Sequence, residues 1–328
     1  MRLANKLQPG DEIRVIAPAR SLSILNEETK TIATRRLEGM GFKVTFGRHI
    51  AESDDFNSSS IASRVEDLHE AFADTNVKGI LTVIGGFNSN QLLDYIDWEL
   101  ISRNPKVICG FSDITALNNA IYAKTGLVTY SGPHYSSFGQ KLYFDYTLDY
   151  FKKCCMNNDQ FPIYASDNWS DDHWHNNQDD RLLMPNSGFV VINEGQAEGT
   201  LLGGNLCTFN LLQGTPYMPS LENSILFIED DVIGNHMDFA EFDRNLQSLI
   251  HMPEFKGVKG IVIGRFQKAS VINDSLLQQI IKSKRELDNM PVISGVDFGH
   301  SDPKITFPIG GAVAIDTDAD VKIRFISH

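Results

Sequence analysis

The sequence contains little cysteine: four residues in 328, two of them adjacent in the chain. Cys109, Cys154, Cys155 and Cys207 follow none of the spacings that are typical of a metal site or a redox-active pair. A disulfide framework is therefore not expected. Free thiols in the reducing cytoplasm fit this content best, so the sequence predicts a cytoplasmic protein.

Long hydrophobic runs and an excess of positive charge are also missing. No segment approaches about 18 consecutive apolar residues, so no membrane-spanning helix is expected. Residues 1–6 lack the apolar stretch of a secretion signal. Lysine and arginine number 29 against 42 aspartates and glutamates, which gives a net charge of −13 at pH 7. Such a balance argues against a nucleic-acid backbone or an anionic membrane as a partner.

What is present describes a globular protein that is large enough for two domains. Hydrophobic residues make up 42% of the chain and charged residues 22%, an ordinary composition for a globular protein. In the first half, apolar runs alternate with segments of helical periodicity, which predicts an α/β domain with a parallel, doubly wound sheet. Strands are expected at 13–17, 42–46, 79–84, 106–109 and 127–130, and helices at 27–38, from 61 to 72, from about 89 and from 114.

The pattern changes between about 150 and 195. Residues 169–180 are polar, acidic and aromatic without clear periodicity, which predicts a long loop, and long loops in compact domains are often functional. Its tryptophans, Trp169 and Trp174, are placed to cover a substrate as a lid. Beyond it, short strands and helices predict a second, α+β domain. We therefore expect an N-terminal domain over 1–165, a linker and covering loop over 166–195 and a C-terminal domain over 196–328.

Ser112 is the first candidate catalytic residue. It lies in the segment Gly110–Thr115, between a short buried strand and a helical pattern. A serine at such a junction can present its hydroxyl above the carboxyl end of a sheet, next to free helix N–H groups. A hydrolytic nucleophile needs this exposure and these donors. The alternative is an N-cap, because Ser and Asp are favoured cap residues.

Glu229 and His300 supply the partners that a nucleophilic serine needs. Glu229 ends an apolar run, and His300 follows the segment 296–299. The chain order Ser, Glu, His is the order found in α/β-hydrolases, although Ile114 rules out the G-x-S-x-G motif. The alternatives are a solvated strand end or a cation site for Glu229, and a turn role for His300.

Two further features are weighed in the same way. Gly85 and Gly86 follow a buried strand, so the amide of Gly86 could form an oxyanion hole with that of Asp113, although a tight turn explains these glycines equally well. The stretch is not G-x-G-x-x-G, which disfavours a dinucleotide site. His173 and His175 lack a second ligand pair at a recognisable spacing, so no metal is expected.

As an ordered set, these segments resemble the serine LD-carboxypeptidase family, whose members include the microcin C immunity proteins. By this resemblance Ser112 is the nucleophile, His300 the general base and Glu229 its orienting carboxylate, and the amides of Gly86 and Asp113 are the oxyanion donors. The resemblance implies a Rossmann-like N-terminal domain, a C-terminal domain with a β-barrel-like sheet, an active site between them, a homodimer and no cofactor. It extends over nearly the whole chain, through 9–11, 16–18, 85–86, 110–115, 132–133, 203–206, 226–230, 299–300 and 307–310.

The segment 86–93 and the long insert 169–181 look more like the microcin-immunity branch of that family. In that branch an aromatic residue of the loop stacks a nucleobase, which makes Trp169 and Trp174 candidate substrate contacts. Asn88, in the segment 86–93, is a further candidate substrate contact. The expected activity is hydrolysis of the amide bond of a peptidyl or aminoacyl nucleotide, through an acyl-enzyme. The alternatives are removal of the terminal D-alanine from a murein tetrapeptide, and a small-molecule binding protein without turnover.

Overall fold

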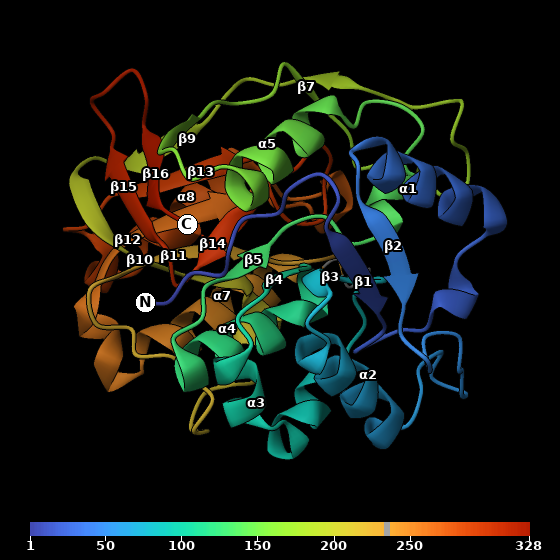
Figure 1. Cartoon of the computed structure of the whole chain (residues 1–328). Coiled ribbons are helices and arrows are strands. Elements are labelled where there is room, and N and C mark those ends of the chain that lie inside the picture. The colour runs from blue at the N-terminus through green and yellow to red at the C-terminus, as the bar shows by residue number, and fades with distance from the viewer. Residues whose placement is uncertain (233–236) are drawn as a thin grey trace.

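Two β-sheets organise the computed structural model, which describes residues 1–232 and 237–328 (Figure 1). The first sheet has the strand order β14-β5-β4-β3-β1-β2. Its five N-terminal strands run parallel, and β14 pairs with β5 in the antiparallel sense. The strands are β1 (Glu12–Ile16), β2 (Lys43–Phe46), β3 (Val77–Thr82), β4 (Val107–Cys109), β5 (Thr129–Ser131) and β14 (Phe307–Ile309).

Helices cover both faces of this sheet. In Figure 1, α2, α3 and α4 lie side by side below it, and α1 and α5 lie above it. Polar side chains cap the first turns of α1 and α2: Asn26 accepts a hydrogen bond from the Thr29 amide, and Ser60 accepts one from the Ser63 amide. The helices are α1 (Glu27–Gly39), α2 (Ile61–Ala73), α3 (Trp98–Arg103), α4 (Thr115–Thr125) and α5 (Asp145–Met156).

The helix expected from about residue 89 is divided in two. A 3₁₀ segment, η2 (Ser89–Tyr95), ends at Ile96, whose backbone is extended. Asp97 then begins α3 by accepting a hydrogen bond from the Leu100 amide. A side-chain cap of this kind competes with a continuous helix, which is the physical reason for the break.

The second sheet has eight strands in the order β6-β16-β15-β10-β11-β12-β13-β9. Strands β10 to β13 run parallel, and the remaining neighbours pair in the antiparallel sense. The expected α/β fold with a parallel sheet and a second sheet is thus confirmed. The strands are β6 (Phe161–Ile163), β9 (Val190–Asn193), β10 (Gln196–Asn205), β11 (Ser224–Glu229), β12 (Val258–Gly264), β13 (Val292–Val296), β15 (Ala312–Asp316) and β16 (Ile323–Ser327); the helices are α6 (Leu206–Asn210), α7 (Asp238–Ile250) and α8 (Asp274–Lys282).

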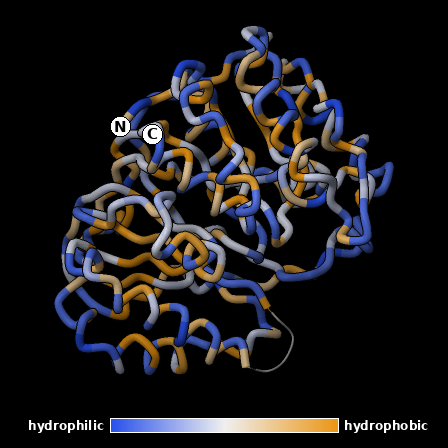
Figure 2. The backbone as a smooth tube through the Cα atoms, turned by 90° about the horizontal axis from the view of Figure 1, so that it is seen from below, coloured by the Kyte–Doolittle hydropathy of each residue, from blue (hydrophilic) through white to orange (hydrophobic). Residues whose placement is uncertain are grey.

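The two sheets exchange strands and share a core. Strand β6, inside the expected N-terminal segment, pairs with β16 in the second sheet, whereas β14 from the C-terminal segment joins the first sheet. Phe227 of β11 packs against Phe298, Phe307 and Phe325, at ring-centroid distances of 5.6, 5.2 and 5.9 Å. The two ends of the chain lie close together in both views (Figures 1 and 2).

Hydrophobic residues concentrate on the strands in the interior, and polar residues on the outer segments (Figure 2). All six residues of β11 are buried, as expected for a strand covered on both faces. Within the described residues, no helix is both long and apolar enough to cross a bilayer.

Candidate active site

Ser112 occupies the turn between β4 and α4, in a strained backbone conformation. Its φ angle is +58°, in the left-handed region that residues with a side chain rarely adopt. A short 3₁₀ segment, η3 (Ser112–Ile114), leads directly into α4. The left-handed conformation costs about 1–2 kcal/mol, and such strain is typical of functional turns that present a side chain.

His300 lies within hydrogen-bond distance of both Ser112 and Glu229. Its Nε2 is 3.0 Å from the Ser112 hydroxyl, and its Nδ1 is 2.8 Å from Glu229 Oε2. Glu229 ends β11, and His300 follows β13, so the three side chains come from the ends of three separate strands in two sheets. The side chain of Glu229 is 4% exposed and that of His300 is 15% exposed.

Gly299 leaves the space in which Glu229 reaches His300. Its φ is +98°, and a Cβ atom there would lie 2.6 Å from Glu229 Oε2. Any side chain would therefore both strain the turn and push against the carboxylate. In the sequence, Gly299 looks like an ordinary turn residue. In the structure, the contact between Glu229 and His300 requires a glycine at this position.

The end of β10 approaches α4 and joins the second sheet to the Ser112 turn. The Asn119 side chain donates to the Gly203 carbonyl at 2.8 Å and accepts from its amide at 3.2 Å. The Thr115 hydroxyl accepts from the Asn205 amide at 3.0 Å. Gly204 packs so closely on Thr115 that a Cβ would lie 2.4 Å from its Oγ1. This contact fixes the sheet that carries Glu229 against the helix that follows Ser112.

The charges around His300 favour its protonated form. Burial disfavours the imidazolium, but the carboxylates of Glu229 and Asp231 outweigh it and raise the pKa of His300 to about 9. Asp230 is partly buried beside Glu229, and this burial together with the negative neighbour raises the pKa of Asp230 to about 7. The site is an acidic cluster in which the imidazole is the group best able to hold a proton.

The glycine loop after β3 approaches Ser112 at Gly85. A Cβ on Gly85 would lie 3.0 Å from the Ser112 Oγ and 3.6 Å from the Asp113 amide nitrogen, so only glycine lets this loop come so close. The carboxylate of Asp113 accepts hydrogen bonds from the amides of Asn88 and Ser89, at 3.1 and 2.9 Å. Asp113 thereby holds the loop that carries Gly86 in place, a role that the sequence analysis did not foresee.

Asn88 faces inward in the structure. It is 5% exposed, its side-chain amide donates to the Ser58 hydroxyl at 3.2 Å, and its carbonyl accepts from Arg64. These contacts describe a residue that supports the glycine loop. Phe87 is instead half exposed next to Phe56, with ring centroids 6.2 Å apart, and it offers the accessible aromatic surface of this loop.

The loop that carries Trp169 and Trp174 is fastened to the segment after His300. Ser170 and Asp302 exchange backbone hydrogen bonds of 2.7 and 2.8 Å. Further along, the Nε of Arg181 donates to the carboxylate of Asp172 at 2.7 Å. Trp169 belongs to the two-residue strand β7 (Asn168–Trp169), which pairs with β8 (Met184–Pro185). Trp174, further along the loop, is half-buried.

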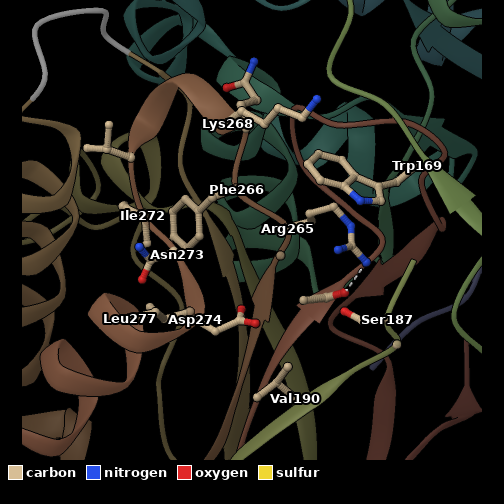
Figure 3. A pocket seen from close by; sticks show the side chains of 15 residues that line it. Trp169, Ser187, Val190, Arg265, Phe266, Lys268, Ile272, Asn273, Asp274 and Leu277 are labelled. Carbon is tan, nitrogen blue, oxygen red and sulfur yellow. Dashed lines mark hydrogen bonds between the residues drawn. The ribbon is translucent and has the colours of Figure 1, made fainter. Parts of the chain in front are cut away.

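Trp169 borders a cavity of about 550 Å³ (Figure 3). The Arg265 guanidinium lies 5.0 Å and the Lys268 ammonium 5.8 Å from the centre of its ring. Arg265 also donates to Asp297 at 3.1 Å, three residues before His300. None of Ser112, Glu229, His300 and Trp174 lines this cavity, so the two tryptophans of the loop lie in different surroundings.

Some contacts of the site were not predicted from the sequence. Asp231 Oδ2 lies 3.6 Å from His300 Nε2. The ring of Phe111 packs between His134 and His300, at 4.3 and 5.6 Å between centroids. The chain fragment Glu229-Asp230-Asp231 was the available signal for Asp231, but only the fold shows which carboxylate faces which nitrogen. Within the described residues, His173 and His175 belong to no cluster of three or more side chains suited to a metal ion.

This architecture defines a class: a two-sheet α/β protein in which a serine at a strained strand-to-helix turn is hydrogen-bonded to a histidine, and the histidine to a buried glutamate. Comparison with known proteins agrees. A model of the LD-carboxypeptidase N-terminal domain matches residues 13–132, and one of the C-terminal domain matches residues 198–315. The chain belongs to the LD-carboxypeptidase family and is an enzyme of the serine carboxypeptidase type.

Relatives extend along almost the whole chain. The provisionally named carboxypeptidase YocD of Bacillus subtilis (strain 168) is 56% identical over 313 residues, which cover 95% of each chain. The microcin C7 self-immunity protein MccF of Escherichia coli is 32% identical, over 96% of this chain and 93% of its own. A Bacillus subtilis protein provisionally named a murein peptide carboxypeptidase is 30% identical, over 95% and 90%.

Solved structures agree with the fold over its full length. An MccF-like protein from Bacillus anthracis (strain Ames) has a TM-score of 0.99 at 52% identity and covers 100% of both chains. MccF in complex with glutamyl sulfamoyl guanosine has a TM-score of 0.88 at 29% identity, over 99% of this chain and 98% of its own.

Proposed function

We propose that this protein hydrolyses the amide bond of an aminoacyl or peptidyl nucleotide with Ser112 as nucleophile, His300 as general base and Glu229 as the carboxylate that orients the imidazole. The observation that carries the proposal is the pair of contacts on His300, 3.0 Å from Ser112 and 2.8 Å from Glu229. Such an array can activate a hydroxyl that is otherwise a weak nucleophile.

In the proposed reaction, Ser112 Oγ attacks the carbonyl carbon, and His300 in its neutral form, the minor form below its pKa of about 9, takes the hydroxyl proton on Nε2. The amides of Gly86 and Asp113 donate to the oxygen that becomes negative. His300 then gives the proton to the leaving nitrogen as the carbon–nitrogen bond breaks, which leaves an ester on Ser112. Water, deprotonated by His300, cleaves this ester and restores the enzyme.

The relatives support the proposed substrate class. MccF is a self-immunity protein, and it has been solved with glutamyl sulfamoyl guanosine and with aspartyl sulfamoyl adenosine. For base stacking we favour Trp174 over Trp169, because Arg265 and Lys268 already lie against the Trp169 ring. We further propose that the protein acts in the cytoplasm as a homodimer. A murein tetrapeptide is the second candidate substrate, given the relative named for murein peptides.

The test supplies glutamyl sulfamoyl-adenosine and a murein tetrapeptide in parallel to the purified protein, with products read by mass spectrometry. We expect release of glutamate from the nucleotide, and a loss of about 10⁴-fold or more in Ser112→Ala. Ser220→Ala, at an exposed serine, serves as the matched control and should keep full activity. Release of D-alanine alone would select the murein substrate, whereas full activity in Ser112→Ala would contradict the mechanism.

A further inference from the structure

His300 faces two carboxylates, one near each ring nitrogen. Glu229 contacts Nδ1 at 2.8 Å, and Asp231 Oδ2 lies 3.6 Å from Nε2, the nitrogen that also faces the Ser112 hydroxyl at 3.0 Å. At 3.6 Å the Asp231 oxygen is beyond a normal hydrogen bond but within ion-pair distance. The nitrogen that receives the serine proton thus has a negative charge beside it.

The backbone that follows orients the Asp231 carboxylate. The Val232 amide donates to Asp231 Oδ1 at 2.8 Å and to the Gln267 side-chain oxygen at 3.0 Å. With Oδ1 held in this way, Oδ2 is the oxygen that faces the imidazole. The Asp231 side chain is 52% exposed, whereas that of Glu229 is 4% exposed, so the two carboxylates act in different surroundings.

We propose that Asp231 is a positioning residue of the reaction, a second carboxylate that stabilises the imidazolium of His300 from its Nε2 side. The inference rests on the proposed function of Ser112 and His300. When the Ser112 O–H bond breaks and the Nε2–H bond forms, His300 gains a positive charge next to Asp231. The carboxylate attracts this charge without taking the proton, because the nitrogen–oxygen distance is too long, so the proton stays available for the leaving nitrogen.

The other charged and titratable groups around His300 do not cancel this effect. Glu229 adds negative charge at the end of β11. Asp230, whose pKa is raised to about 7, adds negative charge only above neutral pH. Lys304 opposes them, but its ammonium is paired with Asp302. Burial strongly lowers the pKa of His134, which packs on the other side of Phe111, so it adds no positive charge near neutral pH. The raised pKa of His300 agrees with this balance.

The test compares pH profiles of kcat/KM for the wild-type protein, Asp231→Asn and Asp320→Asn, with glutamyl sulfamoyl-adenosine. Asparagine keeps the oxygen that accepts from Val232 and removes only the charge. A half-exposed pair shifts the pKa of its partner by about half a unit, so the acid limb of Asp231→Asn should move to lower pH by about that amount. Asp320→Asn makes the same change of net charge at an exposed turn residue between β15 and β16, and its profile should match wild type.

A second measurement separates this inference from the proposed function. In ¹³C-histidine-labelled protein, with the His300 signal assigned by His300→Gln, the NMR titration of His300 should move down by the same half unit in Asp231→Asn. An unchanged titration and an unchanged acid limb would overturn the role of Asp231. If neither substrate is turned over, the proposed function fails, while the NMR titration still decides whether Asp231 acts on His300.

Discussion

One oxygen of Glu229 determines which nitrogen of His300 is free to take a proton. Because the buried carboxylate accepts a hydrogen bond from Nδ1–H, with a nitrogen–oxygen distance of 2.8 Å, the lone pair of the neutral ring lies on Nε2, opposite Ser112. Glu229→Gln has nearly the same size, but its amide can donate to Nδ1 and hold the wrong tautomer. We therefore expect kcat to fall by about 10³–10⁴-fold, with a much smaller change in KM.

Steady-state kinetics with glutamyl sulfamoyl-adenosine checks this, together with circular dichroism to show that Glu229→Gln is folded. The exposed residue Glu254 provides a control, since Glu254→Gln makes the same chemical change away from His300. A loss of less than tenfold in Glu229→Gln would mean that His300 does not depend on this carboxylate.

At this scale the sequence singled out the three side chains that the structure brings within hydrogen-bond distance, but not how each is held. Ser112, Glu229 and His300 all follow apolar runs, which is a local signal. The left-handed backbone of Ser112 and the inward orientation of Asn88 have no local signal, since both depend on packing between segments far apart in the chain.

At the scale of elements, the loop 169–181 is held at its far end by one buried side chain. Gln178 is 5% exposed; its amide donates to the Gly139 carbonyl at 2.7 Å, and its oxygen accepts from the Lys141 amide at 3.0 Å. Truncating Gln178 leaves the buried Gly139 carbonyl without this hydrogen bond, at a cost of about 1–3 kcal/mol, and also frees the Lys141 amide. In Gln178→Ala we expect the loop to detach locally, and KM to rise about tenfold with little change in kcat, if the loop covers the substrate as proposed.

Limited proteolysis and hydrogen exchange test this directly. Cleavage and exchange within 169–181 should become several times faster in Gln178→Ala, while exchange of the buried strand β11 stays unchanged. Asn176→Ala, at an exposed position of the same loop, is the matched control and should behave like wild type. Equal protection of the loop in both variants would show that Gln178 does not hold it.

Elements of the first half were easier to predict than those of the second, for a physical reason. Strands β1 to β4 lie close to the expected ranges. Strands β1, β3 and β4 are mostly buried, as expected for parallel strands covered on both faces, whereas β2 is a more exposed edge strand. Strand β10 contains three glycines, and β14 is only three residues long, so their β structure comes from their neighbours. The exchange of β6 and β14 between the sheets likewise has no local signal.

At the scale of the whole molecule, Lys6 near the start of the chain and His328 at its end meet in a buried cluster. The Lys6 ammonium lies 2.7 Å from His328 Nδ1, donates to the Cys154 carbonyl at 2.6 Å and to the Tyr130 hydroxyl at 3.1 Å. His328 Nε2 lies 2.9 Å from the Asp159 carbonyl. In this arrangement a neutral His328 donates from Nε2 and accepts from Lys6 at Nδ1. A protonated ring would place a second positive charge against Lys6.

This cluster predicts a loss of stability in acid. Burial, and then Lys6, lower the pKa of His328 below its ordinary 6.5, against the opposing effect of the Asp159 and Cys154 carbonyls. Below pH 6.5 the unfolded chain therefore binds a proton at His328 that the folded chain does not. The free energy of unfolding consequently decreases as the pH is lowered, by at most about 1.4 kcal/mol per pH unit for this group. Above pH 6.5 the contribution of His328 is complete and constant.

His328→Gln removes this titration while its amide can still donate to the Asp159 carbonyl. Urea unfolding of both proteins at pH 5 to 8 gives the free energy of unfolding as a function of pH. The two curves should run parallel above pH 6.5 and converge below it, because only the wild-type protein loses stability by keeping His328 neutral in the folded state. Buried His134 also has a lowered pKa and favours acid instability, but it is present in both proteins, so the difference between the curves isolates His328. Curves that stay parallel down to pH 5 would mean that His328 takes up a proton without disturbing its contact with Lys6, and that the junction of the chain ends does not sense pH.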